Sequence, residues 1–369
     1  MTELSITELT FIFAITVQLV YWLVWLIGVI KIKSTPNTSD SHGVSVIVAV
    51  NNELQNLKLL LPLIFAQTYD LFEIIIVDDR SSDGSYEYLQ DSSKNNAQLK
   101  VLTVNDLPDH LNSKKYALTL GIKSASYDQL LFTDADCRPS STNWIESFAK
   151  TWNENSSFIL GFSPYESKPG LLNYFIRFET LLTGIQYLAS AAMGKPYMGV
   201  GRNLSYSKKL FLSNKGFHGF QNVMGGDDDI YVNKYATSSN ATVALSGNSI
   251  STSIPKTNLS DYILQKTRHL SAGKHYSFKS KIMLFFFTFT WMLTWALLPF
   301  IFISTEYYLL LGILILLRFI IMGIVFYVFS KKATVKFNLL GLILLDFMFA
   351  LYYFAIGTKT LLTKQVKWK

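Results

Sequence analysis

The sequence predicts an α/β domain with a mostly parallel sheet, carrying transmembrane helices at both ends. Between residues 42 and 280, short apolar runs alternate with helical stretches, which is the pattern of parallel strands joined by crossover helices. Outside that segment the chain consists mainly of long apolar blocks. Hydrophobic residues make up 50% of the 369-residue chain, and the mean hydropathy of +0.25 is high for a soluble protein.

The alternation begins at Val44–Val50, where a continuous β-branched run is typical of a strand buried on both faces of a sheet. It continues with a helix at Leu54–Gln67, a strand at Phe72–Val77, a helix around Tyr86–Asp91, a strand at Leu99–Val104, a helix at Lys114–Ala125 and a strand at Gln129–Thr133. A later amphipathic stretch, Leu171–Ala192, is interpreted as a packing helix, with an interfacial role at a membrane as the alternative.

Four aspartates stand directly after predicted strands: Asp78, Asp79, Asp134 and Asp136. Ligands of such sheets bind at the carboxyl ends of the strands, so we expect these side chains to share a site. The stretch LLFTDADCRP, which contains the second pair, also fits a solvated turn. The alternative is a bound cation. Because the chain has a single cysteine, Cys137, a cysteine-based zinc site is excluded and oxygen ligands are expected.

Four apolar blocks are each long enough to span a bilayer, for which about 20 residues suffice. They are Leu9–Ile30, Ile282–Ile303, Tyr307–Phe329 and Phe337–Gly357. The first is interpreted as an anchor, because its amino-terminal flank is acidic and no small-residue cleavage site follows it. We therefore divide the chain into an anchor with its linker (residues 1–41), a cytoplasmic domain (42–280) and a membrane domain of two to three spans (281–369).

The net charge of +7 reflects lysines that cluster beside the apolar blocks. Under the positive-inside rule, lysines after the first block and before the second place residues 42–280 in the cytoplasm. A final set conflicts with four spans: Lys359, Lys364, Lys367 and Lys369. Either the last block is interfacial or re-entrant, or the rule fails there. No patch of basic and aromatic residues indicates nucleic-acid binding.

Seven motifs, taken in order, resemble the membrane-bound branch of family 2 of the inverting glycosyltransferases. They are VSVIV with the following NNE, FEIIIVDDRSSDGS, SKKYALTLGI, LLFTDADCRP, GRNLSYSK, GGDDDIYVN and QKTRH. The resemblance covers residues 43–276 and extends to ceramide glucosyltransferases, hyaluronan and cellulose synthases and bacterial cell-envelope enzymes. It implies a GT-A-type nucleotide-sugar-binding domain.

The resemblance also implies a donor site. Asp79 would accept a hydrogen bond from the base, with Asp78 and Glu53 near the nucleoside. Lys114 would pair with the diphosphate, although a solvated lysine is an equally good interpretation. Asp134 and Asp136 would hold Mg²⁺ or Mn²⁺, with Asp136 the firmer metal ligand and Asp134 nearer the sugar.

GGDDDIYVN implies the catalytic base, Asp228, next to Asp227 and Asp229. Three adjacent carboxylates repel one another, so at least one pKa should be raised. The alternative is an acidic helix N-terminus.

QKTRH implies that Gln265 and Arg268 bind the diphosphate. His269 replaces the tryptophan of the family's QxxRW, which is a stacking surface for an acceptor sugar. A packed, hydrogen-bonded histidine is the alternative to an acceptor role. In GRNLSYSK, Gly201 and Asn203 are acceptor-site candidates, and a simple β-turn is the alternative.

Two charges fall inside the apolar blocks. Arg318 and Asp346 are expected to form a structural pair, because charges at membrane depth are costly alone. Contact with a lipid phosphate or a glycan path is the alternative.

The sequence therefore predicts an integral membrane, metal-dependent hexosyl- or N-acetylhexosaminyl-transferase of a bacterial inner membrane and cell envelope. Its donor would be a nucleotide diphosphate sugar, which the resemblance implies is UDP-linked. Its acceptor would be a lipid or lipid-linked glycan. The alternatives are a processive polysaccharide synthase and a catalytically inactive membrane scaffold of the same fold.

Overall fold

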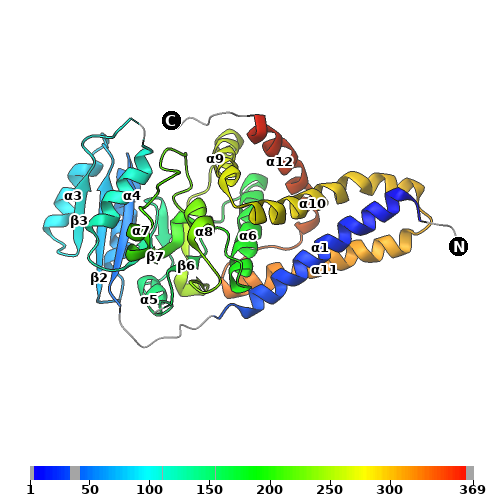
Figure 1. Cartoon of the computed structure of the whole chain (residues 1–369), viewed down its shortest axis with the longest axis horizontal. Coiled ribbons are helices and arrows are strands. Elements are labelled where there is room, and N and C mark those ends of the chain that lie inside the picture. The colour runs from blue at the N-terminus through cyan, green and yellow to red at the C-terminus, as the bar shows by residue number, and fades with distance from the viewer. Residues whose placement is uncertain (1–3, 34–41, 110, 154, 363–369) are drawn as a thin grey trace.

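The central sheet has seven strands in the order β3-β2-β1-β4-β7-β6-β8 (Figure 1). The computed structural model describes residues 4–33, 42–109, 111–153 and 155–362. The strands are β1 Val44–Val50, β2 Phe72–Asp78, β3 Leu99–Thr103, β4 Gln129–Phe132, β6 Phe158–Gly161, β7 Leu204–Ser207 and β8 Ala241–Ala244. Two short strands, β5 Cys137–Pro139 and β9 Ser251–Ser253, form a separate antiparallel pair.

The strands β3, β2, β1 and β4 are parallel to one another. β1 pairs in parallel with β2 and β4, and β2 pairs in parallel with β3. β7 runs antiparallel to both β4 and β6. The predicted α/β class with a mostly parallel sheet is confirmed. As a result, the carboxyl ends of β1, β2 and β4 meet at one edge.

Helices cover both faces of this sheet. They are α2 Leu54–Phe65, α3 Ser85–Lys94, α4 Ser113–Ser124, α5 Trp144–Ala149, α6 Leu171–Ala192, α7 Lys208–Ser213, α8 Asp229–Tyr235 and α9 Leu259–Ala272. Alternate residues of β1 enter different cores: Val46 packs with Leu57 of α2, and Ile47 packs with Ala117 of α4. β1 is thus buried on both faces, as its β-branched run predicts.

Four helices are long and apolar enough to cross a membrane: α1 Ile6–Lys31, α10 Phe278–Ser304, α11 Tyr308–Lys332 and α12 Leu342–Leu362. α1, α10 and α11 form a bundle that extends away from the sheet (Figure 1). α1 also packs against α6, where Gly28 lies so close to Ala189 that a Cβ would meet its carbonyl oxygen at 2.5 Å. This contact joins the bundle to the sheet domain.

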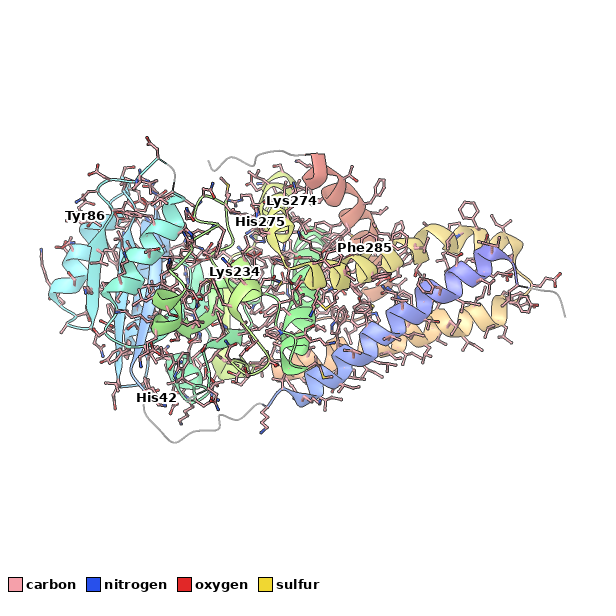
Figure 2. The ribbon with its side chains drawn as sticks, viewed as in Figure 1. His42, Tyr86, Lys234, Lys274, His275 and Phe285 are labelled. Carbon is pink, nitrogen blue, oxygen red and sulfur yellow. The ribbon has the colours of Figure 1, made fainter. Side chains whose placement is uncertain are left out.

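The start of α10 combines a lysine-rich flank with exposed aromatic side chains. Figure 2 shows Lys274 and His275 on the side of the bundle that faces the sheet, with Phe285 further along α10. Phe285 is 58% exposed, and the phenylalanine that starts α10, Phe278, is 76% exposed. Exposed aromatic side chains after a lysine-rich segment are typical of a helix entering a lipid bilayer.

α12 begins five residues later than the apolar block that predicted it, at Leu342 rather than Phe337. The preceding backbone is held by α6 instead: Arg177 donates to the carbonyl of Lys336, and the Tyr174 hydroxyl donates to the carbonyl of Asn338. These bonds use side chains of a helix distant in sequence, so the apolar pattern alone cannot place the start of α12.

α12 does not follow the bundle. It packs against α9, α10 and α6, and Figure 1 shows it turning back to end beside α9. Lys359 lies on α12, whereas Lys364, Lys367 and Lys369 lie outside the described residues. This course favours the interfacial or re-entrant alternative for the last block, because its end returns to the side of the sheet domain.

The predicted Arg318–Asp346 pair is present and is bidentate. Both guanidinium nitrogens donate to the carboxylate at 2.9 Å, and Trp295 Nε1 donates to it at 2.7 Å. Both charged side chains are almost completely buried. The pair therefore ties α11 to α12, which supports its structural interpretation.

Candidate active site

One cavity of about 370 Å³ lies between the carboxyl edge of the sheet and the helices α6 and α9. Its volume is within the range typical of small-molecule sites. It brings together nine of the residues singled out from the sequence: Lys114, Asp134, Asp136, Asp227, Asp228, Asp229, Gln265, Arg268 and His269. Segments separated by more than a hundred residues therefore share a single site.

Asp134 and Asp136 occupy the loop after β4. Asp134 forms an ion pair with Lys114 at 3.0 Å, and Asp136 accepts a hydrogen bond from Ser253 Oγ at 3.3 Å. Burial raises the pKa of Asp136, and the neighbouring Asp134 raises it further. Two carboxylates held this close favour a bound cation.

The donor set fits a hard divalent cation. Among the residues that the structure describes, no group of three or more histidine, cysteine or acidic side chains could hold a metal. Asp134 and Asp136 are the residues that would hold the cation, through carboxylate oxygens. Mg²⁺ and Mn²⁺ prefer such oxygen ligands and commonly take the rest of their shell from phosphates and water.

The three consecutive aspartates have different partners. Asp227 lies 3.4 Å from Lys114, and Asp229 accepts a hydrogen bond from the Tyr276 hydroxyl at 2.8 Å. Asp228 accepts only backbone N–H groups within the described chain, from Gly201 at 2.6 Å and from Asp229 at 2.7 Å. Asp228 is therefore the member whose carboxylate is not committed to another side chain.

The pKa values of Asp228 and Asp229 are raised, in line with the prediction that at least one of the three would be. Burial and the adjacent Asp227 raise the pKa of Asp228, although Lys114 and the Gly201 N–H oppose the shift. Burial and Asp228 raise the pKa of Asp229 well above its ordinary value. A buried carboxyl group with a raised pKa is suited to accept a proton near neutral pH.

Lys114 connects the two acidic groups. It lies in the first turn of α4 and forms ion pairs with Asp134 and Asp227. Burial disfavours its charge, but the aspartates hold its pKa well above the ordinary value. Its side chain is 30% exposed, and the two ion pairs favour a role inside the site over a freely solvated lysine.

The QKTRH segment lies on α9. Gln265 Nε2 donates to the Tyr165 hydroxyl at 3.3 Å, while Arg268 and His269 line the cavity. Burial and the nearby cation Lys266 hold the pKa of His269 well below its ordinary value.

Arg202 is a cavity residue that the sequence interpretation missed. It follows Gly201 in a short 3₁₀ turn, Gly201–Asn203, and its guanidinium lies 4.3 Å from the ring centre of Tyr165. Its Nη1 is buried and has no hydrogen-bond partner within the described residues. Arg202 also opposes the raised pKa of Asp136, as a nearby positive charge does. The sequence signal that could have identified Arg202 is its position between Gly201 and Asn203, the two candidates taken from GRNLSYSK.

Three predicted donor residues lie beside the cavity rather than in its lining. Asp79 pairs with Arg80 at 2.9 Å, and Asp78 accepts the Ser81 N–H at 3.3 Å while its Oδ1 is buried without a partner within the described chain. Glu53 is half-buried, and burial followed by the charges of Asp136 and Asp134 raises its pKa. All three follow β1 or β2 at the common edge.

The two acceptor-site candidates in GRNLSYSK, Gly201 and Asn203, have different surroundings. Gly201 contacts Asp228 directly through its N–H. Asn203 is fully buried outside the cavity lining, where it accepts from Trp144 Nε1 at 2.9 Å and donates to the carbonyls of Phe162 and Ser249 at 2.7 Å. These bonds occupy the Asn203 amide, so its position supports a structural role and not acceptor contact.

Comparison with known proteins bears on the family and the fold. Residues 45–211 match the profile described as Glycosyl transferase family 2. The chain is 33% identical over 126 residues to glycosyltransferase AglE of Haloferax volcanii, and 35% identical over 104 residues to poly-beta-1,6-N-acetyl-D-glucosamine synthase of Staphylococcus aureus. These alignments cover 34% and 28% of this chain and only 40% and 24% of the relatives.

The fold is also found in a solved structure. The mannosyltransferase PcManGT from Pyrobaculum calidifontis, in complex with GDP-Man and Mn²⁺, superposes with a TM-score of 0.62 at 15% identity. The match covers 96% of this chain and 100% of that protein. The GT-A-type domain with apolar helices at both ends is therefore confirmed as the fold class.

Proposed function

We propose that the domain whose residues 45–211 match the glycosyltransferase family 2 profile transfers a sugar from a nucleotide diphosphate sugar to a hydroxyl group with inversion. The observation that carries the proposal is the single cavity in which Lys114 links Asp134 to Asp227. The proposed cation-binding pair and the acidic run that contains Asp228 are thus linked by one lysine. This supports the proposal, because inverting transfer needs both a base for the acceptor hydroxyl and a group that stabilises the departing diphosphate.

The donor would lie along the carboxyl edge of the sheet. Asp78, Asp79 and Glu53 contact the nucleoside, while Gln265 and Arg268 contact the diphosphate. Asp134 and Asp136 would hold Mg²⁺ or Mn²⁺, which when bound neutralises the charge of the departing diphosphate. Lys114, already inside the site, adds a fixed positive charge for the same group.

Asp228 acts as the general base. Its carboxylate removes the proton from the acceptor hydroxyl as the oxygen attacks the anomeric carbon. The N–H groups of Gly201 and Asp229 each bond one oxygen of this carboxylate, which lines the cavity. Asp229 accepts a hydrogen bond from the Tyr276 hydroxyl, which holds it in place beside Asp228.

We propose a UDP-linked hexose or N-acetylhexosamine as the donor sugar. Similarity to an enzyme named for N-acetyl-D-glucosamine supports this choice. The structural neighbour holds GDP-Man, so guanine-linked sugars are the comparison to test first.

The acceptor would be a lipid or lipid-linked glycan at the cytoplasmic face of a membrane, in bacteria the inner membrane. The cavity supports this because it is lined by Leu284 of α10 and by Tyr352 and Tyr353 of α12 as well as by the acidic groups. The lysines beside the apolar blocks support the cytoplasmic placement. A processive polysaccharide synthase is the second candidate, because one relative is named as one.

The test is a panel of UDP- and GDP-linked sugars offered to the purified full chain with Mn²⁺. We expect binding and slow release of nucleoside diphosphate for one UDP-linked sugar. Absence of binding and release for every donor would overturn the proposed function. The length of the product, resolved by mass, distinguishes a single transfer from a polymerase.

A further inference from the structure

The side of the cavity away from the sheet is formed by one face of α6. Glu179, Thr183 and Gln186 all line the cavity, and their spacing of four and three residues places them on one side of the helix. The other buried positions of α6 are mostly phenylalanine, leucine, isoleucine and alanine. A polar row on such a helix costs stability unless it binds something polar.

Glu179 is held in a buried, charge-balanced group. Lys266 of α9 forms an ion pair with it, and Thr183 Oγ1 donates to it at 3.3 Å. The side chains of Glu179 and Lys266 are only 8% and 9% exposed. Because the charges of the pair cancel, this part of the cavity offers hydrogen-bonding groups without a net charge.

A second observation indicates a polar ligand in the same space. Tyr197 lines the cavity and is 3% exposed, yet its hydroxyl has no hydrogen-bond partner within the described residues. Buried hydroxyl groups are normally hydrogen-bonded, so an unpartnered hydroxyl on a cavity-lining residue marks a place where a polar group is missing.

We propose that the α6 face of Glu179, Thr183 and Gln186 binds the head group of the acceptor, and that this head group is a neutral polyhydroxylated group such as a sugar. The inference rests on the proposed function. An anionic lipid phosphate fits poorly, since the paired Glu179 and Lys266 leave no free positive charge to bind it on this face, and it would lie near the acidic trio. A phosphate also needs no base to attack, whereas a hydroxyl uses Asp228.

The reaction follows from this placement. A hydroxyl oxygen of the head group forms a bond to the anomeric carbon while the bond from that carbon to the phosphate oxygen breaks. The electron pair of the broken bond leaves with the nucleoside diphosphate, and the hydroxyl proton passes to Asp228. Leu284, Tyr352 and Tyr353 then lie where an apolar chain attached to the head group would run toward α10 and α12.

The experiment compares two classes of acceptor probe with the full chain in a zwitterionic detergent. Dodecyl β-D-glucoside, dodecyl β-D-galactoside and dodecyl N-acetyl-β-D-glucosaminide represent neutral head groups, and dodecyl phosphate represents the anionic class. Thr183→Val and Gln186→Met each remove hydrogen-bonding atoms without adding charge. Thr267→Val is the matched control, because Thr267 bonds within α9 to Ile263 and does not line the cavity.

We expect transfer to at least one alkyl glycoside and none to dodecyl phosphate. Each cavity variant should raise the acceptor KM about tenfold, as loss of a buried hydrogen bond does, with the donor KM and slow donor hydrolysis unchanged. Thr267→Val should match the unaltered protein.

Transfer to dodecyl phosphate, use of neither class while donor still binds, or an unchanged acceptor KM in both variants would each overturn the inference. Failure to bind any donor would instead overturn the proposed function, so the two failures are distinguishable.

Discussion

The cavity has two walls that differ in how their charges are balanced. The sheet wall, formed by Asp134, Asp136, Asp227 and Asp228, holds more carboxylates than Lys114 and Arg202 together can neutralise. The helix wall, formed by Glu179, Thr183, Gln186 and Lys266, is balanced by its own ion pair. Unbalanced charge suits a cation and a charged leaving group, and balanced polar groups suit recognition of a neutral molecule. Substitutions in the two walls should therefore change different properties of the reaction.

The largest effect is expected at the sheet wall from Asp228→Asn. The amide keeps the shape of the side chain but cannot accept a proton, so kcat for transfer should fall by about a thousandfold. Donor affinity, measured by calorimetry, should stay within about twofold. Normal turnover in this variant would assign the base to another group and would remove the contrast between the walls.

Withdrawal of divalent cation should have the next largest effect. Chelation with EDTA should lower transfer about a hundredfold, and Mn²⁺ or Mg²⁺ should restore it, because the developing diphosphate charge is otherwise uncompensated. Asp136→Asn should weaken the Mn²⁺ dependence, read as the concentration for half-maximal activity. Asp70→Asn, at an exposed position, is the control. Full activity in EDTA would contradict a metal at the sheet wall.

The pH profile should reflect the sheet wall alone. The pKa of Asp228 is raised above its ordinary value of 3.8, and only the ionised carboxylate accepts a proton. As the pH falls through this raised pKa the base is protonated, so kcat/KM should fall about tenfold for each further pH unit. Thr183→Val should keep the same profile. An acid limb that moved in this helix-wall variant would show that the walls are coupled.

Arg202→Lys should give the smallest of these effects. Lysine keeps the positive charge near Asp136 but loses the planar group that stacks on Tyr165. We expect a loss of about tenfold in kcat/KM for the donor, with the acceptor KM unchanged. Arg202→Met should be more severe, because it also removes the charge. A defect confined to the acceptor KM would move Arg202 to the helix wall.

Much of the sheet wall could be predicted from the sequence, because its residues stand next to features of local sequence. Asp134 and Asp136 follow an apolar run that can only be a buried strand, and parallel strands end at one edge by geometry. Asp228 lies in a run of acids whose mutual repulsion is evident from adjacency alone. The strand at Val44–Val50 was predicted with the bounds that the structure shows.

The helix wall could not be predicted in this way. Glu179 and Lys266 are each an ordinary charged residue on a helical stretch, and only the packing of α6 against α9 brings them together. The position of Arg202 likewise depends on its contact with Tyr165, which is distant in sequence. Asn203 is the opposite case. The motif predicted a site residue, but the Asn203 amide forms its hydrogen bonds inside the core.

The sequence by itself determined the α/β class, the apolar helices and the acidic residues of the sheet wall, because hydrophobic period and strand ends are local properties of the chain. Only the tertiary structure decided which cation meets which acid, where α12 begins and which polar side chains face the cavity. Those outcomes depend on contacts between segments far apart in the chain, and such contacts are set by packing rather than by any local pattern.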